Sequence, residues 1–300
     1  MWHAFAGNKT LVTTMNALPD RVVARVVATM GFVETRGANF YFEEKGEGLP
    51  IFLIHPAGST ASTWGDLVDD LEGVGRVIAY DRRGYSRSEG QPVRSASEHT
   101  KDAVAVLEAL EAEPAVIVGT SAGAAIAVDV AVRRPDLVRA VVVHETPWRA
   151  LLHPSTQSLG TLVRTQSLAW RGHYAEAAET LLRFVYSYRD GGSAWDLFPA
   201  EWRRTAAEHG RSVVADLRCT MGSYPRADEL AKITPLVVCT YGARSRSYMK
   251  SITRSLTKTI PTATVHEIDG AAHAVAFDAP GAFAQLIVQA IRSSRSRSGC

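Results

Sequence analysis

The sequence predicts an α/β fold in which a mostly parallel sheet is covered by helices on both faces. Short, nearly all-apolar runs recur along the chain, as expected for strands that are buried on both sides. Helix-like stretches separate these runs, and strand–helix alternation favours a parallel sheet. One long section interrupts the alternation, and it contains only helical patterns. Three hundred residues can form one large core with a smaller cap.

The expected strands begin with a hairpin, formed by Phe32–Thr35 and Asn39–Glu43 around Arg36-Gly37-Ala38. Helical patterns are clearest over His99–Glu111 and Ala122–Arg133. Six further runs are expected as core strands: Pro50–His55, Arg76–Tyr80, Ala115–Val118, Ala140–His144, Pro235–Thr240 and Val265–Ile268. Together these elements predict a sheet of eight strands.

The chain divides into a core and three other parts. Residues 31–146 and 233–292 carry the strand–helix pattern, and residues 147–232 read as an inserted helical cap. This cap holds four of the six tryptophans, and an insertion of this size between core strands is typical of a lid over a site. Residues 1–30 form an N-terminal extension, in which Pro19–Met30 resembles a short amphipathic helix. Residues 293–300 have few apolar side chains and are expected to be disordered.

Composition excludes several classes of protein. The net charge is +2, from 33 Lys and Arg against 31 Asp and Glu, so nothing favours binding to nucleic acid or to a membrane surface. No run of about 18 apolar residues is present. Cys219, Cys239 and Cys300 have no paired spacing, so we expect neither disulfides nor zinc, and a cytoplasmic location.

The segment Gly119-Thr-Ser-Ala-Gly123 contains the candidate nucleophile, Ser121. It lies between an apolar run and a helical pattern, which is the context that a G-x-S-x-G turn requires. The sharp turn exposes the serine hydroxyl, and the two glycines leave room where side chains would collide. The alternative is a phosphate-binding turn, but the sequence lacks the glycine spacing of such turns.

His273 is the candidate general base, because a serine hydroxyl becomes nucleophilic only when its proton is removed. It follows the last expected strand and precedes the last helix, which places it on a loop at the carboxyl edge of the sheet. Among the other histidines, His99, His153, His173 and His209 lie in helical or cap segments, His266 lies within an expected strand, and His55 suits a structural role. The alternative for His273 is a histidine on a solvent-facing loop.

Glu145 is the candidate acid that orients His273. The stretch after the expected strand Pro235–Thr240, from Tyr241 to Tyr248, contains no carboxylate, although an acid is usually found there. Glu145 follows the preceding strand, and its length gives it reach to Nδ1 of His273. Asp269 is too close to His273 along the chain, and Asp278 lies beyond it. The alternative for Glu145 is a turn-capping role before a proline.

Backbone amides are expected to bind the negative charge that develops on a substrate carbonyl oxygen. The amide of Ala122 directly follows the nucleophile. The second amide should come from the loop His55-Pro-Ala-Gly58, where Pro56 has no N–H and Ala57 is the candidate.

These motifs, together with Tyr80–Ser88 (Y-D-R-R-G-Y-S-R-S), resemble the α/β-hydrolase superfamily in order and spacing over residues 31 to 292. The segments His144–Pro147 and Gly191–Trp195 and the G-A-R-S-R-S stretch also resemble the zearalenone lactonases. That resemblance implies Ser121, Glu145 and His273 as a triad, Ala57 and Ala122 as oxyanion donors, and Trp195 as a substrate-lining residue. It implies that an ester or lactone bond is cleaved without a metal or cofactor.

The aromatic residues of the cap predict an apolar or aromatic small-molecule substrate. We therefore add Trp148 and Tyr188 to the candidate substrate-binding residues, although aromatic residues of a cap often form only its own core. The alternatives to ester hydrolysis on this fold are C–C bond cleavage, a non-hydrolytic reaction and ligand binding without turnover. The sequence leaves a homodimer open.

Overall fold

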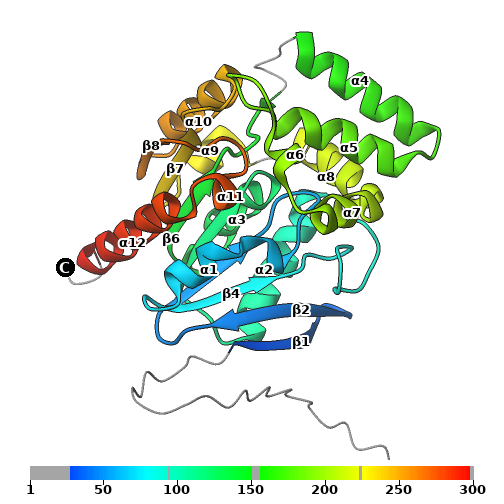
Figure 1. Ribbon diagram of the computed structural model, residues 1–300. Helices are drawn as coiled ribbons and strands as arrows, with labels where there is room; N and C mark the ends of the chain where they lie inside the picture. The colour runs from blue at the N-terminus through cyan, green and yellow to red at the C-terminus, as the bar shows by residue number, and fades with distance from the viewer. Residues whose placement is uncertain (1–27, 94, 151–155, 223–224, 298–300) are drawn as a thin grey trace, which may run out of the picture.

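The computed structural model describes residues 28–93, 95–150, 156–222 and 225–297, and it contains one eight-stranded sheet (Figure 1). The strand order is β1-β2-β4-β3-β5-β6-β7-β8, with β2 antiparallel to both β1 and β4 and the other neighbours parallel. This confirms the predicted mostly parallel sheet. The strands are β1 (Thr29–Thr35), β2 (Ala38–Lys45), β3 (Pro50–Ile54), β4 (Arg76–Tyr80), β5 (Ala115–Thr120), β6 (Val138–His144), β7 (Leu236–Gly242) and β8 (Ala263–Ile268).

The predicted hairpin is β1–β2, and the backbone conformation of its turn explains why a glycine is found there. Arg36 and Gly37 occupy the turn with φ of 49° and 68°. Two consecutive positive φ values match the right-handed twist of the two strands, and glycine adopts such values without strain.

Helices cover both faces of the sheet. On one face α2 (Ala96–Ala109), α3 (Ala122–Arg133) and α10 (Ser247–Thr259) pack against alternate strand residues such as Phe52 and Ile117. On the other face α1 (Asp66–Leu71) and α12 (Pro280–Arg297) cover residues such as Leu53 and Val118. Each central strand is therefore buried on both sides, which is why its sequence is a continuous apolar run.

The section between β6 and β7 is helical, as predicted, and we call it the helical insertion. Apart from its last short helix, which packs on the core before β7, it lies beyond the carboxyl ends of the strands (Figure 1). Its helices are α4 (Thr156–Trp170), α5 (Tyr174–Val185), α6 (Ala194–Leu197), α7 (Ala200–Glu208), α8 (Gly210–Gly222) and α9 (Ala227–Leu230). Three short helices belong to the rest of the chain: η1 (Ala61–Trp64), η2 (Pro135–Leu137) and α11 (Val275–Asp278).

Two predictions at the chain ends need correction. The expected helix Pro19–Met30 lies mostly outside the described residues, but Thr29 and Met30 begin β1, so the prediction of helix there is wrong. The expected disorder of residues 293–300 is wrong up to Arg297, where α12 ends, and residues 298–300 lie outside the described part. Ser294 is buried and donates a hydrogen bond to the carbonyl of Ile291, since the packed face of α12 carries the helix into the polar stretch.

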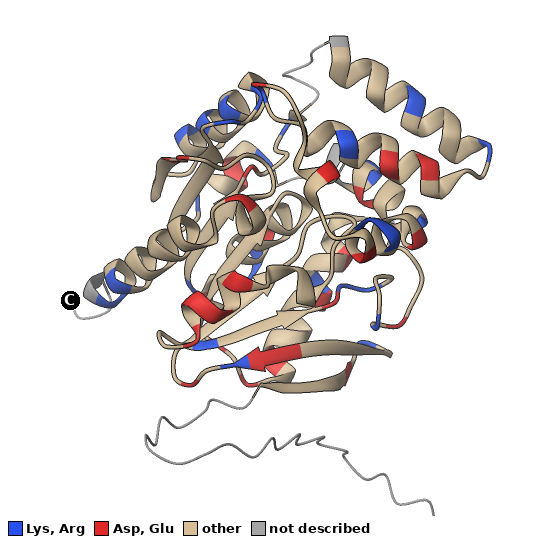
Figure 2. Cartoon of the chain, in the orientation of Figure 1, with Lys and Arg blue, Asp and Glu red and all other residues tan. Residues whose placement is uncertain are grey.

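Acidic and basic residues are interspersed over the side of the molecule seen in Figure 2. Within the described residues, no helix combines the length and the apolar character that crossing a membrane requires. Cys219 and Cys239 are buried free thiols.

Candidate active site

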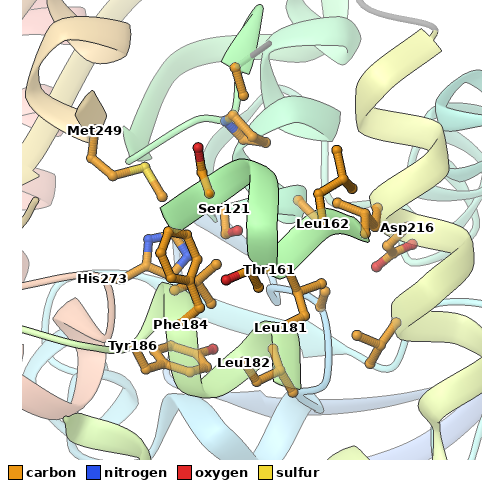
Figure 3. Close-up of a pocket in the computed structure, with 18 of the residues that line it drawn as sticks. Ser121, Thr161, Leu162, Leu181, Leu182, Phe184, Tyr186, Asp216, Met249 and His273 are labelled. Atoms are coloured by element: carbon orange, nitrogen blue, oxygen red, sulfur yellow. The ribbon is translucent and has the colours of Figure 1, made fainter. Parts of the chain in front are cut away.

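Ser121 lies at the turn between β5 and α3, where the backbone is strained. Its φ of 51° and ψ of −119° are unfavourable for a residue with a side chain. A hydrogen bond of 3.0 Å from the Ser121 amide to the carbonyl of His144 holds the turn against the end of β6. The strain turns the side chain out of the sheet and toward a mostly apolar cavity, which Ser121 lines (Figure 3).

The two glycines of the turn are required by close packing. A β-carbon on Gly119 would overlap the backbone of Gly123, and one on Gly123 would overlap the carbonyl oxygen of Ile54. Helix α3 therefore begins in direct contact with β3 and β5. This agrees with the predicted reason for both glycines.

Glu145 and His273 meet beneath this turn. Glu145 directly follows β6, the strand between β5 and β7, and His273 lies on the loop after β8. Nδ1 of His273 lies 2.8 Å from Oε2 of Glu145, and the amide of Gly242 donates to Oε1 at 3.1 Å. Both side chains are buried. Asp269, which shortly precedes His273 in the sequence, is exposed.

The electrostatics of this pair favour a charged glutamate. Burial alone raises the pKa of Glu145, but the hydrogen bond from His273 and the neighbouring ring of His144 outweigh it and lower that pKa to about 2. A carboxylate can only accept, so Nδ1 of His273 carries the hydrogen. In the neutral ring Nε2 then has a free lone pair, as a base that takes a serine proton requires.

The loop that carries His273 is fixed from two sides. Nε2 of His144 donates to the carbonyl of Ala272 at 2.9 Å, and burial lowers the pKa of His144 to about 4, which keeps its ring neutral. Asp278 accepts from the amide of Ala272 at 2.9 Å and from the hydroxyl of Tyr188 at 2.8 Å. The position of the His273 ring is thus set by β6 and by the helical insertion.

The cavity beside Ser121 and His273 has a volume of about 200 Å³ and is mostly apolar. Its walls come from α4, α5, α8 and α10 as well as from the core, and Figure 3 shows Phe184, Leu181 and Leu162 around it. The leucine and valine side chains in the lining are Leu159, Leu162, Leu181, Leu182, Val185, Val213 and Leu217.

Ala57 and Ala122 also line this cavity. Among the described residues, neither amide makes a hydrogen bond. His55 holds the loop before Ala57, since its Nε2 accepts from the amide of Arg82 at 3.0 Å and its Nδ1 lies 2.8 Å from the carbonyl of Pro56. Both residues whose amides are predicted to bind an oxyanion therefore border the cavity that Ser121 lines.

The structure separates the three aromatic residues predicted to bind substrate. Trp195 lines a second, smaller cavity that also borders His273. Trp148 packs in the main core, and the Tyr188 hydroxyl is bound to Asp278, so neither residue is part of the lining of the two cavities.

Sequence reasoning missed the buried carboxylate of the larger cavity, Asp216 on α8. It accepts from Arg82 at 2.6 Å, from the hydroxyl of Tyr85 at 2.7 Å and from Nε2 of His99 at 3.0 Å, all buried. Burial opposes its ionisation, but the Arg82 guanidinium and His99 hold the pKa of Asp216 well below its usual range. The only sequence signal for this ion pair was Arg82, a charged residue inside the Tyr80–Ser88 motif. Asp216 could not be recognised as its partner because the two residues are 134 positions apart.

A sheet of this topology, with a serine at the turn after the fifth strand and helices over it, defines a protein of the α/β-hydrolase fold. The chain belongs to the alpha/beta hydrolase family, whose model matches residues 51–286.

Relatives of the chain include hydrolases of several kinds. It is 34% identical to the uncharacterized hydrolase YraK of Bacillus subtilis over 129 residues, which are 41% of this chain and 46% of that protein. It is 30% identical to the zearalenone hydrolase of Bionectria ochroleuca over 129 residues, 41% of this chain and 49% of that protein. The chain thus aligns with about half the length of these relatives. The enol-lactonase from Burkholderia xenovorans LB400 has the same fold, with a TM-score of 0.70 and 21% identity over 87% of this chain and 99% of that one.

Proposed function

We propose that the protein is a serine hydrolase that cleaves a carboxylic ester or lactone through an acyl-enzyme. One observation carries the proposal. The Glu145 carboxylate binds Nδ1 of His273 at 2.8 Å, and that ring lines the same cavity as Ser121, whose strained turn exposes its hydroxyl. A nucleophile, a base and an orienting acid from three separate loops are the parts that acyl transfer requires.

In the proposed reaction Nε2 of His273 takes the proton of Ser121 as Oγ attacks the substrate carbonyl carbon. The amides of Ala57 and Ala122 stabilise the oxyanion. His273 then gives its proton to the leaving oxygen, and the C–O bond of the substrate breaks. Water hydrolyses the acyl-enzyme in a second cycle with the same base. Glu145 keeps the ring in the required tautomer and stabilises it while it is protonated.

The apolar cavity supports an apolar or aromatic substrate, and the helical insertion acts as its cap. The zearalenone hydrolase among the relatives supports a macrolactone in particular. In this proposal Trp195 acts from the smaller cavity beside His273 and not on the acyl group in the larger cavity, while Trp148 and Tyr188 act through the packing and the hydrogen bond described above.

The test combines labelling with product analysis. Wild type should bind a fluorophosphonate covalently at Ser121, whereas Ser121→Ala should not react. Wild type should open lactones or aryl esters, with a loss of about 10³-fold or more in Ser121→Ala. A labelled wild type that releases no acid from any ester or lactone would instead favour C–C bond cleavage or another reaction. Unaltered ligand affinity in Ser121→Ala, with no turnover by wild type, would favour a binding protein.

A further inference from the structure

The smaller cavity lies beside His273 and has a volume of about 40 Å³. We call it the side chamber. It shares only His273 and Tyr186 with the lining of the larger cavity. Pro56 and Gly58, the neighbours of Ala57, and Thr120, the neighbour of Ser121, also line it. The side chamber therefore adjoins the nucleophile, the base and the oxyanion loop without being part of the larger cavity.

Three indole groups line the side chamber, those of Trp64, Trp195 and Trp202, and the first two are almost fully buried. Trp64 from η1 and Trp195 from α6 both line it, with exposed fractions of 2% and 3%. Neither Nε1 has a hydrogen-bond partner among the described residues. An indole N–H can only donate, and a buried donor without an acceptor is costly. The side chamber is a cavity that both of these rings border.

The size of the side chamber selects its occupant. A buried water needs on the order of 10–15 Å³ of such volume, so about 40 Å³ holds a few water molecules. A cavity that binds benzene has a volume of about 150 Å³, so an aromatic ring does not fit there. The hydroxyl of Thr63 and the side chain of Ser59 add polar groups to the same walls, which suits water.

We propose that the side chamber holds and orients the water that deacylates the enzyme, an inference that rests on the proposed acyl-enzyme. When a lactone opens, its leaving hydroxyl stays attached to the acyl group and continues to occupy the larger cavity. The attacking water must therefore arrive from another side of His273. Water held by the two indole N–H groups keeps its own hydrogens free to be donated to Nε2 of His273.

The step is balanced without any other reactant. Nε2 takes one proton from water as the water oxygen bonds to the acyl carbon. The tetrahedral intermediate then expels Oγ of Ser121, which receives that proton from His273. The products are the free acid and the regenerated serine.

The test separates acylation from deacylation. Trp64→Phe and Trp195→Phe remove the donors and keep an aromatic ring. Stopped-flow release of p-nitrophenol from p-nitrophenyl butyrate gives the acylation rate, and the decay of the acyl-enzyme by intact mass gives the deacylation rate. We expect each variant to deacylate about fivefold more slowly, the loss of one hydrogen bond, with acylation unchanged. Methanol should capture a correspondingly larger share of the acyl-enzyme.

Two further variants control for packing. Trp148→Phe removes another buried indole whose Nε1 has no partner among the described residues, but Trp148 is outside the lining of the side chamber, so the ratio of the two rates should stay at the wild-type value. Ala276→Leu fills the side chamber from α11 and should also slow deacylation. It keeps the test decisive if a tryptophan variant fails to fold.

Two failures are distinguishable. If acyl-enzyme forms but the chamber variants deacylate at the wild-type rate, or lose acylation and deacylation equally, the role of the side chamber is overturned. If no adduct forms on Ser121 in any protein, including wild type, the acyl-enzyme itself is overturned.

Discussion

Strained residues at the ends of two neighbouring strands bring the site together. Ser121 after β5 and Glu145 after β6 have φ of 51° and 46°, and neither is a glycine. Each such residue costs on the order of 1–3 kcal/mol, so the surroundings must enforce it. The Ser121 amide bonds to the His144 carbonyl and the Glu145 amide to the Thr240 carbonyl, both at 3.0 Å. Each turn is therefore held by the strand beside it.

Glu145→Gln tests the charged acid. The amide keeps the size of the side chain but cannot hold the Nδ1–H tautomer in the same way, so kcat should fall about 10³–10⁴-fold.

The effect of the same substitution on stability should depend on pH. The pKa of Glu145 is lowered from 4.5 to about 2, so its contribution to stability is complete above pH 4.5 and is lost as the pH falls toward 2. The difference in urea midpoint between wild type and Glu145→Gln should therefore shrink between pH 5 and pH 2.5.

Glu201→Gln is the matched control, since Glu201 is exposed on α7. It should alter neither kcat nor the pH dependence of the midpoint. A Glu145→Gln enzyme within tenfold of wild-type kcat would contradict the assigned acid.

Three residues of the site could be identified from the sequence because their signals are local. Ser121 lies in a short motif, His273 on a loop after a strand, and Glu145 at a strand end with no competing acid after the next strand. The cavity lining could not be identified this way. Leu162, Leu181 and similar residues on the helical insertion have the same spacing as residues that pack in a core, and only the fold decides which of them face the cavity.

At the level of elements, the contact between α3 and β3 depends on Gly123. Gly123→Ala should lower the melting temperature strongly or prevent folding, because the new methyl group would overlap the Ile54 carbonyl. Gly160→Ala is the control. Gly160 is inside α4, and a β-carbon added there would meet no described atom within 4 Å, so alanine should stabilise by about 0.5–1 kcal/mol. Differential scanning calorimetry compares the two, and equal melting temperatures would refute the packing argument.

Helix α8 is attached to the core through a buried ion pair. The side chains of Arg82 and Asp216 are 1% and 4% exposed, and Nη2 of Arg82 lies 2.6 Å from Oδ2 of Asp216. Asp216→Asn leaves the guanidinium without its counter-charge and should cost about 3–5 kcal/mol of unfolding free energy. The double variant Arg82→Met with Asp216→Leu should cost clearly less than the sum of the two single changes. Additive costs in urea unfolding would show that the pair is not coupled.

The central strands were predicted closely because burial on both faces requires a continuous apolar run in the sequence. For example, β4 has the predicted bounds. Element ends were less predictable. β5 and β7 each continue two residues beyond the predicted run, since neighbouring strands supply hydrogen bonds that the local sequence does not reveal. The same reason applies to α12, whose last turns depend on packing rather than on composition.

On the scale of the whole molecule, the larger cavity exists only when the core and the helical insertion are both folded. Ser121 and His273 come from sheet-edge loops, Phe184 from α5, and Tyr248 and Met249 from α10. In the proposed function the core thus supplies the reacting groups, and the insertion and α10 determine the shape of the substrate. Changes in the insertion should alter substrate preference and leave the acyl-transfer machinery intact.

Phe184→Ala tests this division. Phe184 stacks on Tyr248 with ring centroids 6.1 Å apart, and its removal enlarges the cavity from the side of α5. Along a series of p-nitrophenyl esters, each buried methylene is worth about 0.8 kcal/mol, so kcat/KM should rise up to about fourfold per carbon until the chain meets the wall. The variant should shift that limit to longer chains and react with fluorophosphonate as fast as wild type. Trp170→Ala, at a position 91% exposed on α4, should keep the wild-type profile. An unchanged chain-length limit in Phe184→Ala would mean that the acyl group does not occupy this cavity.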